Sequence, residues 1–404
     1  MRSLFIAATL LGPAAAHAGG YVIPNETARD LALSQAAVAD QTGAEAVFLN
    51  TAALAGPEGI NISASGEILV NRTDWSDPNL GKASMDAQVN TPPAIAISYG
   101  SKLPDGMAWG AAVGMHVPAG GSLEWPDGWQ GQESIKSVKQ LVFAFGGGAA
   151  FQPSPYIKVG VNYVRFQATE ELHQAINYLD HYGDAGIAMS GGANGFGAGL
   201  ELRVPNVPLS FGAMYSHSAD LHIKGDAHFT DVPVPFQPLL HDQGVKEVLP
   251  IPAVFFVGAA YSVMPNLKIM AAYNFEGWSS YKSDKFEGAD GFTVEVPRDY
   301  NNAHVIRAAG EWKEVAPGLT LRLGGLRSIS DQPRETLSPS LTDASSTAFS
   351  LGAGYNIMPQ LRIDLGWQHA FFDKVTAKGD EAFPGSYKTM VDLVSLGVNW
   401  RIGV

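Results

Sequence analysis

Four basic residues occupy strand positions that face away from the apolar side of their strands: Arg307, Arg322, Lys268 and Lys158. Ile306 and Ala308 flank the first of them, and Leu321 and Leu323 flank the second. Successive side chains of a strand point to opposite faces, so each cation lies on the face opposite to its apolar neighbours. Guanidinium and ammonium groups on such a face can hold a carboxylate by charge-assisted hydrogen bonds. The chemistry that these residues indicate is the binding of an acidic ligand.

Other reactive side chains do not combine into a site. His217, His222 and His228 share one stretch, but His217 falls on the opposite face from the other two, so no metal-ligand cluster is predicted. The glycines between Gly195 and Gly199 superficially match a dinucleotide-binding loop, yet no helix follows and the strand alternation runs through them. We therefore predict neither a metal nor a cofactor.

The basic residues belong to a ladder of alternating segments that runs from Ile60 to the end of the chain. Apolar residues exchange with small or polar ones at every position, which predicts β-strands. About fourteen strands are predicted, at 59–72, 92–102, 107–118, 136–152, 156–171, 187–204, 208–228, 251–263, 266–282, 301–314, 318–330, 345–358, 360–376 and 389–403.

The links between these strands alternate in length. Short ones, such as Pro104 to Gly106, alternate with long ones at 73–91, 119–135, 172–186, 229–250, 283–300, 331–344 and 377–388. An even number of antiparallel strands with tight turns at one end and long loops at the other is the plan of an outer-membrane barrel, whereas a soluble β-sandwich has no reason to segregate its loops by length. The predicted fold class is all-β, an antiparallel transmembrane β-barrel of about fourteen strands with an N-terminal plug, or hatch, in its lumen.

Composition agrees with an exported membrane barrel. Residues 1–18 read as a cleaved signal peptide, with Arg2 before an apolar run and Ala16-His17-Ala18 as the cleavage site. With no cysteine, neither a disulfide framework nor a lipid-modified cysteine is possible. The chain has 39 acidic and 26 basic residues, a formal charge of −13 that argues against a nucleic-acid partner. Mean hydropathy of +0.02 does not exclude a barrel, because alternation hides its apolar band.

Residues 19–57 do not alternate and are expected to form the hatch, with the barrel at 58–404. Asn25 or Thr27 can cap a helix, with Asp30 three residues after Thr27, and small apolar residues follow. The alternative is a flexible periplasmic tail. The low charge of the segment and its phenylalanine and leucines favour packing in the lumen, since a barrel of this width is not filled by its own side chains.

The chain resembles the FadL-type outer-membrane transporters of long-chain fatty acids and hydrocarbons. The resemblance rests on Tyr21–Leu54, especially Ala28–Leu33 and Ala46–Ala52, and on Arg307–Trp312, Leu321–Gly325, Leu337–Asp343 and Leu351–Tyr355. It spans nearly the whole chain, and the fourteen strands of the family agree with the number counted above. One departure is Thr51, where the family usually has the proline of an Asn-Pro-Ala sequence. Loss of that proline frees the backbone at this point of the hatch.

The resemblance implies capture of a ligand in an extracellular apolar groove, transfer to a luminal site and release through hatch movement. Exit would be lateral, beside a kink in the third strand. In this sequence the corresponding hatch residues are Phe48, Leu49, Asn50, Thr51 and Ala52. The kink is expected at Gly114, His116 and Pro118, because glycine weakens strand pairing and proline removes a ladder donor. An ordinary strand end is the alternative for that segment.

Two long loops carry apolar residues that suit a capture groove: Leu172, Ile176, Leu179, Val234, Phe236, Leu239 and Leu240. The first three have helical spacing, which predicts an apolar stripe on the loop 172–186. Packing of the two loops on each other is the alternative. The luminal cations are Arg307, Arg322, Lys268 and Lys158, although a barrel cation faces inward whether or not it binds a ligand.

Long-chain fatty acids are the predicted substrate, and a hydrocarbon channel is the first alternative, because a neutral ligand needs no arginine. A general porin would want charged constriction residues rather than a plug, and a barrel lipase would need a Ser–His pair such as Ser280 with His304. The expected partners are outer-membrane lipid, lipopolysaccharide and a hydrophobic small molecule. A monomer is expected, and no enzymatic activity.

Overall fold

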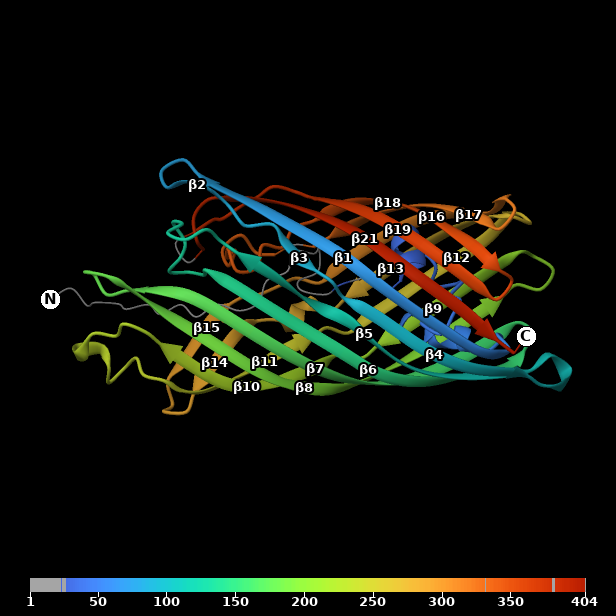
Figure 1. Cartoon of the computed structure of the whole chain (residues 1–404), viewed down its shortest axis with the longest axis horizontal. Helices are drawn as coiled ribbons and strands as arrows, with labels where there is room; N and C mark the ends of the chain where they lie inside the picture. The colour runs from blue at the N-terminus through green and yellow to red at the C-terminus, as the bar shows by residue number, and fades with distance from the viewer. Residues whose placement is uncertain (1–22, 24–26, 331, 380–381, 404) are drawn as a thin grey trace.

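One antiparallel sheet closes on itself to form a barrel (Figure 1). The computed structural model describes residues 23, 27–330, 332–379 and 382–403, so the predicted signal peptide at 1–18 lies outside it. β1 (Gly59–Asp77) pairs with β4 (Pro93–Lys102) on one side and with β21 (Ser386–Ile402) on the other, which closes the wall. The wall has fourteen strands in the described part of the chain, and the predicted fold class is confirmed.

Seven further wall strands are continuous: β5 (Ala108–Glu124), β6 (Ser137–Ser154), β7 (Ile157–Asn177), β8 (Tyr182–Arg203), β17 (Leu319–Ile329), β18 (Ser346–Met358) and β19 (Leu361–Phe372). The other four are each divided in two: β9 (Leu209–Ser216) with β10 (Ala219–Phe229), β11 (Gln243–Ile251) with β12 (Val254–Met264), β13 (Leu267–Glu276) with β14 (Ser283–Gly288), and β15 (Thr293–Pro297) with β16 (Ala303–Ala316). The short strands β2 (Gly81–Ser84), β3 (Gln88–Asn90) and β20 (Val375–Thr376) extend the wall at its long-loop end.

Short 3₁₀ helices interrupt the chain at η2 (Pro104–Gly106), η3 (Val234–Phe236) and η4 (Trp278–Ser280). Asp105 in η2 has a φ of 60° and Gly106 a φ of 75°, the left-handed conformations that a tight turn requires. Among the described residues, no helix has the length and apolar character that a membrane crossing would require.

Several wall strands, among them β1, β5, β7 and β8, extend further toward the long loops than predicted. In β7 the reason is a change in which face is apolar. In the lower part of β7 the outward residues are apolar, and Val161 and Tyr163 are 63% and 56% exposed. Higher in the same strand, Leu172 and Ile176 point inward and are buried. Alternation shows that one face of a strand is apolar but not whether that face meets lipid or the barrel interior. Where the apolar face changes from one side to the other, the pattern breaks and the sequence predicts the end of the strand too early. Much of the predicted loop 172–186 is therefore strand.

The hatch, residues 27–57 in the described chain, lies in the lumen toward the end that carries the short turns and the C-terminus (Figure 1). It consists of α1 (Ala28–Ala32), α2 (Ala46–Leu49) and η1 (Thr51–Leu54). As the sequence predicts, Thr27 caps α1, and its Oγ1 accepts a hydrogen bond from the Asp30 amide at 3.2 Å. Most apolar side chains of the hatch are fully buried, so the plug is packed against the wall rather than suspended in water.

Wall glycines allow the hatch backbone to approach the strands closely. A Cβ atom at Gly110 would lie 2.0 Å from the Leu54 carbonyl oxygen, and one at Gly366 would lie 2.5 Å from that of Ala28. Both distances are far below contact, so only glycine fits at either position.

Candidate functional site

A cavity lies in the lumen on the side of the hatch that faces the long loops. Its free space is about 1120 Å³, including its open mouths. Gln35, Phe48 and Leu49 of the hatch form one border, and the wall residues come from β5, β7, β8, β9, β11, β12, β13 and β16. The cavity is therefore enclosed between the hatch and the part of the wall that runs from β5 to β16.

Most side chains that line this cavity are aromatic or aliphatic: Phe48, Leu49, Val164, Phe166, Met214, Val254 and Phe256. Polar groups are fewer and include Gln35, Asn274, Glu276 and Arg307. Mainly apolar pockets with a small number of placed polar groups are typical of small-molecule sites, where the apolar area binds and the polar groups orient.

Arg307 is the cation of this cavity. It is 3% exposed, and its Nη2 donates to the Gln35 side-chain oxygen at 3.2 Å. Its guanidinium lies 5.2 Å from the centre of the Phe256 ring, within the range of a cation–π contact. Nε and Nη1 have no hydrogen-bond partner among the described residues. A buried arginine with two free donors is costly unless something else accepts those bonds.

Glu276 is the acidic residue whose charge acts on Arg307, but its carboxylate oxygens accept hydrogen bonds from other residues. Asn274 donates to Oε1 at 2.7 Å and the Trp278 indole to Oε2 at 3.1 Å. The carboxylate offsets part of the arginine charge through space without satisfying the guanidinium donors. The site can therefore accept a second, external acceptor at Arg307.

The other three predicted cations lie outside this cavity and are ion-paired. Arg322 donates to Glu311 at 2.8 Å and to Asp364 at 2.7 Å, and all three side chains are buried. Lys158 contacts Glu201, and Lys268 contacts Asp40 of the hatch. The predicted orientation of the three side chains is right, because all of them face the lumen. The structure places them, however, at contacts between hatch and wall or within the wall.

An ionic network joins the hatch to the wall. Arg29 of α1 donates from Nε to Glu311 at 3.1 Å and from Nη2 to Asp40 at 3.1 Å. Glu311 in turn accepts from Arg322. We call these residues, Arg29, Asp40, Glu311, Arg322 and Asp364, the latch. No pattern in the chain signals it, because its members are far apart in sequence and each is an ordinary inward charge.

The five predicted hatch residues divide between cavity and wall. Phe48 and Leu49 line the cavity. Asn50 is buried, and its Nδ2 donates to the Val38 and Leu200 carbonyls at 2.7 and 3.1 Å, which ties the hatch to β8. Thr51 and Ala52 are fully buried against wall glycines such as Gly160.

The segment Gly114–Pro118 lies in an irregular part of β5. Pairing with β6 shifts register between His116 and Ala119. The His116 ring lies 4.0 Å from the Phe48 ring, and the Pro118 carbonyl accepts from the Ile23 amide at 2.7 Å. The irregular strand, the hatch and the N-terminal segment therefore meet at one point of the wall.

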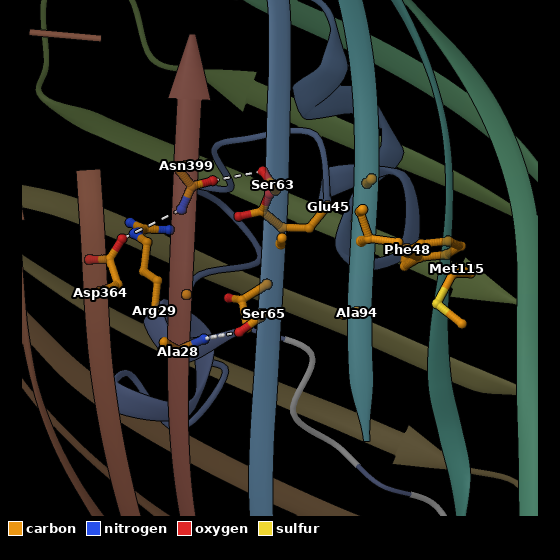
Figure 2. A pocket seen from close by; sticks show the side chains of 15 residues that line it. Ala28, Arg29, Glu45, Phe48, Ser63, Ser65, Ala94, Met115, Asp364 and Asn399 are labelled. Atoms are coloured by element: carbon orange, nitrogen blue, oxygen red, sulfur yellow. Dashed lines mark hydrogen bonds between the residues drawn. The ribbon is translucent and has the colours of Figure 1, made fainter. Parts of the chain in front are cut away.

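A smaller crevice of about 350 Å³ separates the hatch from β1, β4 and β5 (Figure 2). Figure 2 shows Phe48 pointing toward Met115 and Glu45 lying beside Ser63. Glu45 is buried, its Oε2 has no hydrogen-bond partner among the described residues, and burial raises the pKa of its carboxyl to about 7.

The helical stripe predicted for the loop 172–186 is wrong. Leu172 and Ile176 lie in β7 and are 3% and 5% exposed, facing the core; their spacing is that of one face of a strand. Leu179 is at the turn and is 81% exposed. Tyr178 stacks on Phe236 with ring centres 5.7 Å apart, so the two loops do contact each other.

The second loop places its apolar residues differently. Val234 and Leu239 are 76% and 67% exposed, Phe236 is half-buried and Leu240 is buried. Three exposed apolar side chains on adjoining loops, those of Leu179, Val234 and Leu239, remain available at the extracellular surface.

The residues needed for a hydrolytic site are not assembled. Ser280 donates to the Gly277 carbonyl at 3.1 Å, whereas His304 contacts the Tyr273 hydroxyl at 2.7 Å. Among the described residues, no group of three or more histidine, cysteine or acidic side chains is arranged to hold a metal ion.

Comparison with known proteins identifies the family. A family model described as "Outer membrane protein transport protein (OMPP1/FadL/TodX)" matches residues 9–401. The chain belongs to this FadL family. FadL-family proteins are transport proteins of the outer membrane rather than enzymes, and this chain is an outer-membrane β-barrel.

Individual relatives of this FadL-family chain are distant. The "47 kDa outer membrane protein" of Pasteurella multocida (strain Pm70) is 28% identical over 218 residues, which cover 51% of this chain and 50% of that protein. The chain thus spans about half the length of the curated relative that it matches.

Two solved structures share the fold over almost their full length. A Pseudomonas aeruginosa FadL homologue has a TM-score of 0.82 at 17% identity, covering 95% of this chain and 100% of that one. The P. putida toluene transporter TodX has a TM-score of 0.72 at 16% identity, covering 95% and 98%. At these identities the likeness establishes the fold of this FadL-family chain alone.

Proposed function

We propose that this chain transports long-chain fatty acids, with Arg307 holding the carboxylate and the apolar cavity holding the acyl chain. The observation that carries the proposal is the pair of free donors on the buried Arg307 guanidinium inside a largely apolar cavity. A carboxylate would accept a charge-assisted hydrogen bond from one of these free donors.

The acyl chain supplies most of the binding free energy in this proposal. Each buried methylene contributes about 0.8 kcal/mol, so ten contribute about 8 kcal/mol. Aromatic and aliphatic side chains such as Phe166, Met214 and Val254 provide the surface for this burial. Arg307 then acts mainly as a selector, because leaving its donors unpaired penalises a ligand without an acceptor.

The path that we propose begins at the exposed Leu179, Val234 and Leu239, which would form the capture groove. It continues to the cavity, which His116 and Pro118 of the irregular β5 segment also line. Phe48 and Leu49 of the hatch border the cavity, so movement of the hatch would change the shape of the binding site.

Hydrocarbon transport is the second candidate, and the cavity walls favour it. Phe48, Phe166 and Phe256 present ring surfaces that suit an aromatic ligand. Under this alternative, Gln35, Phe256 and the charge of Glu276 would suffice to stabilise Arg307 without a ligand. TodX, which shares the fold at 16% identity, is a toluene transporter.

Mass spectrometry of the purified barrel distinguishes the two. We expect a fatty acid to co-purify with the wild-type chain and to be lost from Arg307→Met, while Lys158→Met retains it. Lys158 is the matched control, since it is an inward cation outside the cavity, and Glu201 keeps Arg203 as a partner. A bound hydrocarbon that is retained in Arg307→Met would support hydrocarbon transport in place of fatty-acid transport. An empty preparation that conducts ions would overturn both.

A further inference from the structure

The barrel wall has a second interruption, between β8 and the divided strand β9/β10. The ladder pairs Gly197 with Ser216 and next pairs Gly192 with His222. Residues 193–196 of β8 therefore stand opposite 217–221 without a regular register. Irregular pairing of this kind in a barrel is costly to keep and recurs beside functional sites.

The neighbouring strand is broken at the same level. Ser216 pairs with Val254 and Ala219 with Ile251, so β9/β10 and β11/β12 both lose their strand geometry over two residues. Pro252 lies in the second break and lacks an amide donor for the ladder. The weak point of the wall thus extends over three adjacent strands.

The luminal cavity reaches this weak point. Gly195 and Ser216 line it, and so do Phe196 and His217, whose side chains face outward. Phe196 is 57% exposed and His217 is exposed. Two outward residues of adjacent strands thus border the luminal cavity at the point where their strands are not regularly paired.

Two rings cover the outer mouth. Phe196 and His217 stack with centres 4.6 Å apart, and the Tyr215 hydroxyl lies 2.8 Å from His217 Nδ1. The main-chain link between the two is the hydrogen bond from the His217 amide to the Phe196 carbonyl at 2.9 Å. Side chains can rotate away from such a mouth without breaking a ladder.

The mouth lies at the upper border of the apolar band. Outward residues below it on β8 are Ala198, Leu200 and Leu202, and the outward residue above it is Asn194, which accepts from the Tyr163 hydroxyl at 2.7 Å. A ligand that passes here enters the acyl layer of the membrane and avoids bulk water. We infer that the gap between β8 and β9/β10 is a lateral port through which acyl chains leave the cavity for the outer leaflet, with the Phe196–His217 pair as its door.

This inference rests on the proposed transport of fatty acids, and site-specific photo-crosslinking tests it. p-Benzoylphenylalanine replaces Phe196 in one protein and Phe211, an outward residue in regularly paired β9, in another. Both proteins, reconstituted in phosphatidylcholine liposomes, are irradiated with an alkyne-tagged oleate. We expect several-fold more adduct at position 196 than at 211, because the latter meets only oleate already dissolved in the bilayer. Equal labelling at both positions would overturn the port.

A blocking variant gives an independent test. A Cβ atom at Gly195 would meet the Cε2 of Phe166 at 2.7 Å, the movable end of a side chain, so Gly195→Leu fills the throat and the barrel can still form. We expect about tenfold slower transfer from protein to membrane, a barrier raised by about 1.4 kcal/mol. Gly66→Leu is the matched control, since its Cβ would have no neighbour within 4 Å. Unchanged transfer in Gly195→Leu, with transfer lost in Val117→Trp in β5, would refute the port.

Binding of cis-parinarate, a fluorescent fatty acid, to each variant separates the two proposals. If wild-type protein fails to bind it in the lumen, the proposed function fails. If the wild type and Gly195→Leu bind it equally while transfer differs, the port stands. If binding and transfer are both unaffected by Gly195→Leu, the port alone is wrong.

Discussion

The two halves of the lumen handle buried charge in opposite ways. At the hatch, Arg29, Glu311 and Arg322 satisfy one another at 2.8–3.1 Å. In the cavity, Arg307 keeps two free donors under an almost identical degree of burial. Arginine therefore forms buried ion pairs in one place and keeps unsatisfied hydrogen-bond donors in the other. Burial and charge alone do not distinguish a binding site from a structural contact.

What distinguishes them is how completely the hydrogen bonds are made. A buried arginine that finds two carboxylates stabilises only the contact that holds them, and it offers nothing to a ligand. An arginine with unpaired donors beside apolar walls carries a cost that a ligand can remove. We therefore expect substitutions at the latch to change stability and substitutions at Arg307 to change binding.

Substitution of Arg322 by methionine should have the largest effect. Glu311 would lose one of its buried partners, and the buried Asp364 would keep the ion pair with the partly exposed Arg362 and a long hydrogen bond from Asn399. Breaking a buried ion pair by removing one partner costs about 3–5 kcal/mol. Urea unfolding of the purified barrel measures this loss. Lys313→Met is the control, because Lys313 is 50% exposed and its contact with Glu311 is worth at most about 1 kcal/mol. Equal losses in both variants would contradict the role of the latch.

Docking of the hatch should weaken as the pH rises from about 4.5 to about 7, the ordinary and the shifted pKa of Glu45. Because burial raises the pKa of this carboxyl, the docked hatch keeps it neutral while the undocked hatch ionises, so docking is strongest below the lower value. The loss over this window is about 3 kcal/mol and is complete near pH 7.

Cysteine labelling reports this equilibrium, because the chain has no cysteine of its own. A probe at Ala37→Cys, fully buried in the hatch, should react faster as the pH rises, after correction for the reactivity of the free thiol. Glu45→Gln should remove the pH dependence. A profile that survives this substitution would assign the titration to another group.

Esterification of the ligand should sharpen the contrast at Arg307. A methyl ester carries no negative charge and accepts a weaker hydrogen bond from the guanidinium than a carboxylate does, so the wild-type chain should bind methyl oleate about 2 kcal/mol more weakly than oleate. Arg307→Met should bind both equally, which gives a double-mutant cycle with a coupling free energy of about the same size. Isothermal titration measures all four affinities. A coupling near zero would mean that the carboxylate does not meet Arg307.

The barrel can be predicted from the sequence, whereas the ion-pair partners of each charged side chain cannot. Alternation at Ile60–Val70 and Val394–Ile402 predicts strands that the structure closes edge to edge. The same alternation predicts that the Arg307 and Arg322 side chains face the lumen. Which of them is ion-paired depends on residues of other strands, such as Glu311 and Asp364 for Arg322, and no local pattern reports such a contact.

Strand ends are hard to place for a different physical reason. Leu172 and Ile176 suit either a helix or an inward strand face, because a spacing of four satisfies both periods. The wall glycines do offer a usable signal: Gly110 and Gly366 interrupt otherwise well-filled strands where the hatch backbone passes. A glycine at an inward strand position is a reason to look for a close backbone approach.

Replacement of Thr51 by proline should have the smallest effect, although it lies in the fully buried hatch. Thr51 is the first residue of η1, where proline is tolerated, and Asn50 has the extended backbone (φ −152°, ψ 97°) that a following proline prefers. The variant loses the hydrogen bond from the Thr51 hydroxyl to the Val47 carbonyl at 3.1 Å but restricts the unfolded chain. These terms nearly cancel, to within about 0.5 kcal/mol. Thr51→Ala loses the bond without the restriction and should cost about 1 kcal/mol. Urea unfolding of both variants decides the sign: a proline variant less stable than the alanine one would mean that the hatch needs backbone freedom at this position.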